Sequence, residues 1–166
     1  MNIDEKLLKT TEAEYGKDYR NHTLEIYKLY LDLSDKLSSR RQSVNSFFLT
    51  LNSFIIGLLG YGKIASSSVA ATPEFYWTIS LLGMVICVVW FKIIHAYKHI
   101  MRSKFIVIHH IEQQLPLATY EAEWQLLREN NAYQPLTHFE MIVPWIFFVL
   151  NLAISLKATF FVKIML

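Results

Sequence analysis

Three long apolar stretches dominate the pattern of hydrophobic and polar positions along the chain. They cover residues 44–61, 75–91 and 141–156, and none of them contains a charged side chain. A helix needs roughly 20 apolar residues to cross a hydrocarbon core about 30 Å thick. Helix tilt and the snorkelling of flanking lysines accommodate small differences in length. We therefore predict three transmembrane helices, at residues 44–62, 75–95 and 140–160.

The polar segments that flank these stretches also have the pattern of helices. No proline interrupts residues 19–62 or 76–115, and Pro116 supplies a stop for the second of these helices. Residues 120–128 fit a short additional helix. The predicted fold class is all-α. The chain is expected to be a polytopic membrane protein, one unit over residues 1–166, whose first two transmembrane helices extend into a cytoplasmic helical bundle.

Apolar side chains repeat every three or four residues along the first predicted helix, from its polar part into its membrane part. The stripe consists of Ile26, Tyr30, Leu33, Leu37, Val44, Phe47, Leu51, Phe54 and Leu58. A heptad-like stripe of this kind is typical of a helix that packs against partners along its whole length. Arg40 interrupts it near the membrane surface, and a charge there needs an acidic group or a lipid phosphate. Asp35, Glu112 and Glu140 are the candidate acidic partners.

Lysine and arginine are concentrated before the first stretch and between the second and the third. Eight lie in residues 1–43 and five in residues 92–140, whereas residues 62–74 contain one. The positive-inside rule then places residues 1–43 and 96–139 in the cytoplasm, and the loop at 63–74 and the C-terminus on the outer side. Four side chains are expected to anchor the helices at the membrane surfaces: Arg41, Lys92, Trp77 and Trp145.

The overall composition supports a membrane protein and excludes several other classes. Hydrophobic residues make up 53% of the 166 residues and charged residues 18%, against about 25% charged residues in typical soluble domains. The net charge of +2 is too small to predict a nucleic-acid partner. The single cysteine, Cys87, excludes an internal disulfide and a cysteine-rich zinc site.

Several polar side chains fall inside the predicted spans. Asn45 and Asn52 follow Ser38 at intervals of seven residues, and Ser53 precedes Gly57 by four. An asparagine in hydrocarbon needs a hydrogen-bond partner, and small residues four apart let another helix approach closely. We interpret Arg40, Asn45, Asn52, Ser53 and Gly57 as contacts between helices, within one chain or at the interface of an oligomer. A polar pore is the alternative.

Six histidines raise the question of metal binding. His95 and His99 are spaced as two zinc ligands on a helix are, but the metalloprotease pattern requires a glutamate where this chain has Ala96. We interpret the pair as interfacial side chains, and pH sensing is the alternative. The sequence contains no glycine-rich phosphate loop and no G-x-S-x-G motif. We therefore predict no catalytic residue, no metal, no cofactor and a protein that is not an enzyme.

Three stretches of the chain, at residues 19–53, 103–124 and 137–145, resemble the RipA family of octameric bacterial membrane proteins. The resemblance covers most of residues 19–145. Its most specific parts are RRQSVNSFF at residues 40–48 and the run from Lys104 through Glu112, Leu115, Pro116 and Tyr120 to Glu123 and Trp124. The resemblance implies a homo-octamer in the bacterial inner membrane, with no catalytic residues to carry over.

Two functions are compatible with these patterns. The first is a non-enzymatic scaffold or a stress and host-adaptation factor, whose cytoplasmic bundle recruits a partner or organises membrane lipids. The second is an oligomeric channel that conducts ions or small solutes along the axis of the ring. The polar lining available to a channel is sparse: Asn45, Ser46, Asn52, Ser53, Asn151 and Ser155. The scaffold is therefore the favoured hypothesis.

Overall fold

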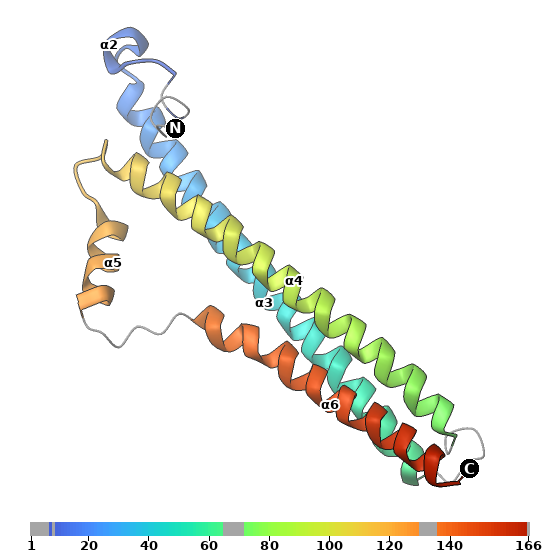
Figure 1. Ribbon diagram of the computed structural model, residues 1–166. Coiled ribbons are helices and arrows are strands. Elements are labelled where there is room, and N and C mark those ends of the chain that lie inside the picture. Colours follow the sequence, from blue (N-terminus) through green and yellow to red (C-terminus); the bar gives the residue numbers. More distant parts are fainter. Residues whose placement is uncertain (1–6, 8, 65–71, 130–135, 166) are drawn as a thin grey trace. The chain divides into compact units, whose positions relative to one another are not determined.

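The computed structural model describes residues 7, 9–64, 72–129 and 136–165. Every regular element in these ranges is a helix (Figure 1). The helices are α2 (Glu12–Tyr15), α3 (Tyr19–Ile64), α4 (Pro73–Glu112), α5 (Thr119–Glu129) and α6 (Leu136–Met165). Most of the outer loop predicted at 63–74 lies outside the described residues.

Three of the helices are long and apolar enough to cross a membrane, which confirms the three predicted spans. Their apolar segments belong to Tyr19–Tyr61, Pro73–Glu112 and Phe139–Phe160. Because α3 and α4 have 46 and 40 residues, each is about twice the length that a hydrocarbon core requires. We treat only their uncharged parts, residues 44–61 and 75–91, as membrane-spanning.

Helix α4 ends three residues earlier than the sequence predicted. The predicted end was Leu115, one residue before Pro116, whereas the observed end is Glu112. The backbone there changes to tighter bonds, from the N–H of Gln114 to the carbonyl of Ile111 (3.0 Å) and from that of Leu115 to the carbonyl of Glu112 (2.9 Å). Such i to i+3 bonds are a common way to close the last turn of a helix.

The contacts divide the chain into two compact units. Unit 1 comprises residues 1–37 and 101–133, and unit 2 comprises residues 38–100 and 134–166. In unit 1, Tyr27 of α3 packs with Ile108 and Ile111 of α4, and these three buried side chains form its core. Six partly buried residues surround it: Leu7, Tyr30, Leu31, Val107, Leu115 and Tyr120.

Unit 2 packs the apolar parts of α3, α4 and α6 together. Its buried hydrophobic side chains are Ile55 and Leu59 of α3 and Cys87, Trp90 and Ile94 of α4. Pro144 of α6 is also fully buried. The predicted third span began at residue 140, which would put Pro144 in its first turns. Because α6 begins at Leu136, this proline lies inside the helix, where it cannot donate to the carbonyl four residues earlier.

Candidate functional site

The polar side chains of the predicted first span are divided between two faces of α3. Asn52 is fully buried and bridges to α4, where the Cys87 thiol donates to its Oδ1 (3.1 Å). Its amide nitrogen donates to the carbonyl of Phe48 in its own helix (2.9 Å). Asn45 accepts a hydrogen bond from the indole Nε1 of Trp90 (3.0 Å). Both asparagines therefore join helices within one chain.

Helix α6 contributes another buried asparagine to unit 2. Asn151 is fully buried and donates to the carbonyl of Phe147 (2.9 Å). A Cβ on Gly83 of α4 would lie 2.5 Å from Oδ1 of Asn151. The Cα hydrogen that takes the place of this Cβ in glycine therefore faces the amide oxygen. Weak Cα–H···O contacts of this type recur where helices approach closely. Gly83 therefore permits the close approach of α4 and α6.

We expect replacement of Gly83 by alanine to destabilise the chain. The added methyl group would displace the buried side chain of Asn151, and overpacking of this kind costs about 1–3 kcal/mol. The control is Gly60→Ala, because a Cβ there meets nothing within 4 Å and alanine is favoured over glycine in a helix by about 1 kcal/mol. Thermal unfolding in mild detergent should show a lower midpoint for the first variant only. Equal midpoints for the two variants would contradict this packing.

Ser53 and Gly57 lie on the opposite face of α3. They belong to a stripe of small residues spaced four and three apart, and every member is exposed: Ser39, Ser43, Ser46, Thr50, Ser53, Gly57 and Gly60. We call this set the small-residue stripe. Gly57 is two residues from the buried Leu59, which corresponds to about 200° around the helix. A Cβ on Gly57 meets nothing within 4 Å, so the fold of one chain does not require glycine there.

An aromatic ridge runs next to the small-residue stripe. Phe47, Phe54 and Tyr61 follow one another at intervals of seven and are 61%, 64% and 66% exposed. The hydroxyls of Ser43 and Thr50 donate to carbonyls of their own helix (3.0 and 2.9 Å). The outer face of α3, defined as the small-residue stripe together with this ridge, therefore has a row of small side chains beside a row of large ones. The hydroxyls of Ser43 and Thr50 are already satisfied.

The predicted charged and aromatic anchors occupy different environments. Arg40 is exposed, whereas its neighbour Arg41 is half-buried and its Nη2 lies 3.6 Å from Oε1 of Glu140. Lys92 and Trp77 are exposed. Trp145 is half-exposed and contacts the rings of its neighbours Phe91 and Phe148 edge-on. Glu140 thus forms an ion pair with Arg41. The apolar stripe of α3 had suggested it as one of three candidate partners for Arg40.

Glu112, the last residue of α4, is the centre of a buried network in unit 1. Its side chain is 0% exposed. Oε1 accepts hydrogen bonds from the Tyr27 hydroxyl (2.7 Å), the Tyr120 N–H (2.9 Å) and the Thr119 hydroxyl (3.3 Å), and Oε2 accepts one from the Glu121 N–H (3.2 Å). The carboxylate therefore caps the N-terminus of α5, where its charge is favoured by the helix dipole.

The environment of Glu112 keeps its carboxylate ionised. Burial alone raises its pKa, but the hydrogen bonds from Tyr120, Tyr27, Glu121 and Thr119 outweigh this effect, so the pKa lies below its ordinary value. Sequence reasoning had offered Glu112 as a partner for Arg40. It missed this role because the cap forms only when the chain folds back after Pro116.

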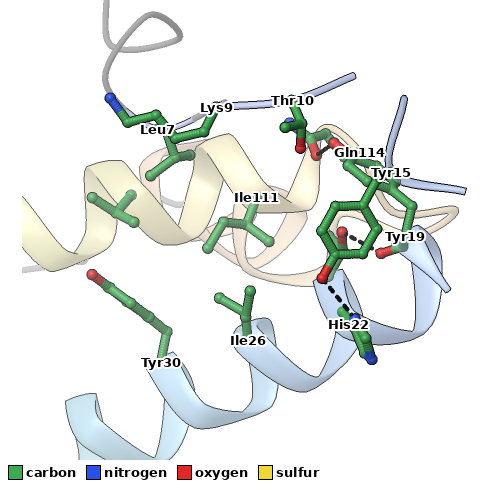
Figure 2. A pocket seen from close by; sticks show the side chains of 12 residues that line it. Leu7, Lys9, Thr10, Tyr15, Tyr19, His22, Ile26, Tyr30, Ile111 and Gln114 are labelled. Atoms are coloured by element: carbon green, nitrogen blue, oxygen red, sulfur yellow. Dashed lines mark hydrogen bonds between the residues drawn. The ribbon is translucent and has the colours of Figure 1, made fainter. Parts of the chain in front are cut away.

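Unit 1 also contains a pocket of about 240 Å³ between α3, α4 and the residues that precede α2. Figure 2 shows Tyr15 pointing across it toward His22, with 2.8 Å between the hydroxyl and Nδ1. The Tyr19 hydroxyl donates to Oε1 of Gln114, which follows the end of α4 (3.0 Å). The first of these hydrogen bonds joins α2 to α3, and the second joins α3 to the segment that follows α4.

A comparison with family models decides which family this architecture represents. The model of the octameric membrane protein family matches residues 24–161. The chain belongs to the octameric membrane protein family. No curated protein and no solved structure was found to match it. The predicted octameric family is thus confirmed, while the finer resemblance to RipA stays a prediction.

The family match covers most of the features described above but not all of them. Glu112, Asn52, Asn151 and the outer face of α3 lie inside the matched residues of this octameric membrane protein. The pocket in Figure 2 takes part of its lining from residues 7–23, which precede the match. That pocket is therefore not a feature that the family match supports.

His95 and His99 form a pair on α4. The Nε2 atoms of His95 and His99 lie 3.1 Å apart, and both side chains are exposed. Over the described ranges, no group of three or more His, Cys, Asp and Glu side chains is placed to hold a metal ion. The two imidazoles are hydrogen-bonded to each other on one face of α4.

Proposed function

We propose that this protein is a non-enzymatic homo-octameric scaffold of the bacterial inner membrane, acting as a stress or host-adaptation factor. Membership of the octameric membrane protein family supports self-assembly. The proposed orientation follows from the lysine and arginine counts, with unit 1 and the N-terminus in the cytoplasm and the C-terminus in the periplasm.

The observation that carries this proposal is the outer face of α3. Its small-residue stripe and its aromatic ridge lie side by side on one helix, so the ridge of one copy can pack on the small residues of the next. A contact between two different patches of identical chains is heterologous, and it generates a closed ring when the rotation between copies closes. The small residues of the stripe favour close helix packing in lipid, where van der Waals contact drives association.

Unit 1 supplies a second surface that supports a scaffold. Leu29 of α3 and Leu126 of α5 are 56% and 64% exposed, and Leu117 between α4 and α5 is 73% exposed. In the proposed orientation these side chains lie in water, where apolar surface favours burial against a partner. We propose that they contact neighbouring copies or a cytoplasmic partner protein.

The runner-up function is a channel along the axis of the ring. Three of its six candidate lining residues, Asn52, Asn151 and Ser155, are buried within the chain, and Asn45 is bonded to Trp90. Ser46 and Ser53 remain on the outer face of α3. This distribution favours the scaffold. Ion or solute flux through proteoliposomes that contain the purified protein would overturn the preference.

Native mass spectrometry in mild detergent tests the assembly directly. We expect a mass of eight times the 19.5 kDa of one chain, because the family is octameric. Extraction in several mild detergents serves as the control for dissociation by the detergent itself. A monomer or dimer under all of these conditions would contradict the proposed ring.

A further inference from the structure

Unit 2 contains a pocket of about 410 Å³ between its three helices, at the point where their apolar parts begin or end. Arg41 precedes the first uncharged stretch by three residues, Glu140 immediately precedes the third, and Trp90 lies at the end of the second. All three side chains line the pocket. The pocket therefore lies at the level of the lipid headgroups, where the polar and apolar parts of all three helices meet.

Arg41 and Glu140 lie near each other in this pocket, at more than hydrogen-bond distance. The 3.6 Å between Arg41 Nη2 and Glu140 Oε1 exceeds the 2.7–2.9 Å that is typical of a charge-assisted hydrogen bond. Both side chains are largely buried, at 16% and 19% exposed. The other carboxylate oxygen of Glu140, Oε2, is buried without a hydrogen-bond partner among the described residues. A buried acceptor of this kind costs free energy unless a donor reaches it.

Pro144 adds a second acceptor on the same residue. It lies inside α6 and has no N–H, so it cannot donate to the Glu140 carbonyl as other helix residues would. Glu140 thus combines an unpartnered carboxylate oxygen with a carbonyl that lacks its usual helical donor. A ligand with an N–H donor could satisfy the carboxylate oxygen.

The remaining lining specifies the rest of the ligand. The guanidinium of Arg41 matches the geometry of a phosphate. Asn45, whose Oδ1 is occupied by Trp90, can direct its amide nitrogen to the same group. Leu49 and Val143 provide an apolar wall. The pocket thus combines a phosphate-binding end, an ammonium-binding end and a surface for hydrocarbon.

We propose that this pocket binds the headgroup of a phospholipid that carries a primary ammonium beside its phosphate, the chemistry of phosphatidylethanolamine. The ammonium donates to Glu140 and the phosphate accepts from Arg41. A choline headgroup has no N–H donor for Oε2, and a glycerol headgroup lacks the positive charge that complements the carboxylate. Ser46 lines the pocket and also belongs to the small-residue stripe, so the pocket borders the face that the scaffold proposal assigns to contacts between copies. The choice of ligand is argued from Arg41 and Glu140 alone, and lipid preference is measured separately from the mass of the assembly.

The test is lipid binding to the purified full-length protein, measured by native mass spectrometry with added lipids of identical acyl chains. We expect ethanolamine lipid to bind about tenfold more tightly than choline lipid, a ratio that corresponds to one hydrogen-bonded contact. Glu140→Gln should abolish this preference, and Arg41→Gln should weaken the binding of both lipids by about tenfold. The matched control is Arg40→Gln, which removes the neighbouring exposed charge and should leave the preference intact.

Three results would overturn the proposal. The first is equal binding of the ethanolamine and choline lipids by the unmodified protein, a comparison that does not depend on the folding of any variant. The second is an equal loss for Arg40→Gln and Arg41→Gln, which would indicate general attraction to the membrane surface. The third is binding of soluble phosphoethanolamine as tight as that of the lipid, which would assign the pocket to a free metabolite.

Discussion

Replacement of Gly57 by leucine is expected to break the octamer into smaller species while each chain keeps its fold. Gly57 lies in the small-residue stripe, and a Cβ there meets nothing within 4 Å in the single chain. Leucine is also a better helix former than glycine by about 0.8 kcal/mol. A loss of assembly would therefore arise from the contact between copies, where four added carbons hold the helices apart.

The size of this effect follows from the geometry of a ring. Overpacking at a tight contact costs about 1–3 kcal/mol. In a closed ring of eight identical chains, the same cost arises at each interface between neighbouring copies. Native mass spectrometry should show little octamer under conditions where the unmodified protein is intact. The matched control is Ala153→Leu, an exposed small residue in the membrane part of α6. An intact octamer for Gly57→Leu together with a broken one for Ala153→Leu would place the interface on α6.

The long apolar runs made the membrane helices predictable from the sequence. An uncharged run of 16 to 18 residues has few stable alternatives to a buried helix, and the absence of proline between residues 19 and 62 predicted that α3 is continuous. The helix ends were less certain, as α4 shows, because the tighter bonds after Ile111 leave no strong sequence signal.

The faces of the helices could not be assigned in the same way. Asn45 and Ser53 are both polar residues in one apolar stretch, but the first bonds to Trp90 and the second is exposed. Only the packing of α4 and α6 distinguishes them. Arg40 and Arg41 differ by one residue, or about 100° of rotation, and the sequence alone does not indicate which of them meets Glu140.

Replacement of Glu112 by glutamine is expected to loosen α5 from unit 1. The neutral amide removes the charge that the α5 N-terminus favours, and its NH2 group faces N–H donors in place of a carboxylate oxygen. Hydrogen bonds to a charged group contribute about 1.5–3 kcal/mol, so we expect a loss of about 3 kcal/mol in local stability. Hydrogen exchange of the α5 amides, including Tyr120 and Glu121, should accelerate by about a hundredfold.

Acidification should produce the same effect in the unmodified protein. The pKa of Glu112 in the folded chain lies below the ordinary value of 4.5, so its carboxylate stabilises the folded state above that pH. This contribution is lost as the pH falls through the lowered pKa. The difference between the unmodified protein and Glu112→Gln should therefore shrink in acid.

The matched control is Glu123→Gln, an exposed glutamate on the same helix, which should leave the exchange of α5 unchanged at every pH. Equal exchange in the Glu112 and Glu123 variants would show that the buried carboxylate does not hold α5 in place. If the Glu112 variant alone loses protection, its octamer can then be compared with the intact one. A ring that survives would place the assembly in the membrane helices, and a ring that falls apart would require α5 for the contact between copies.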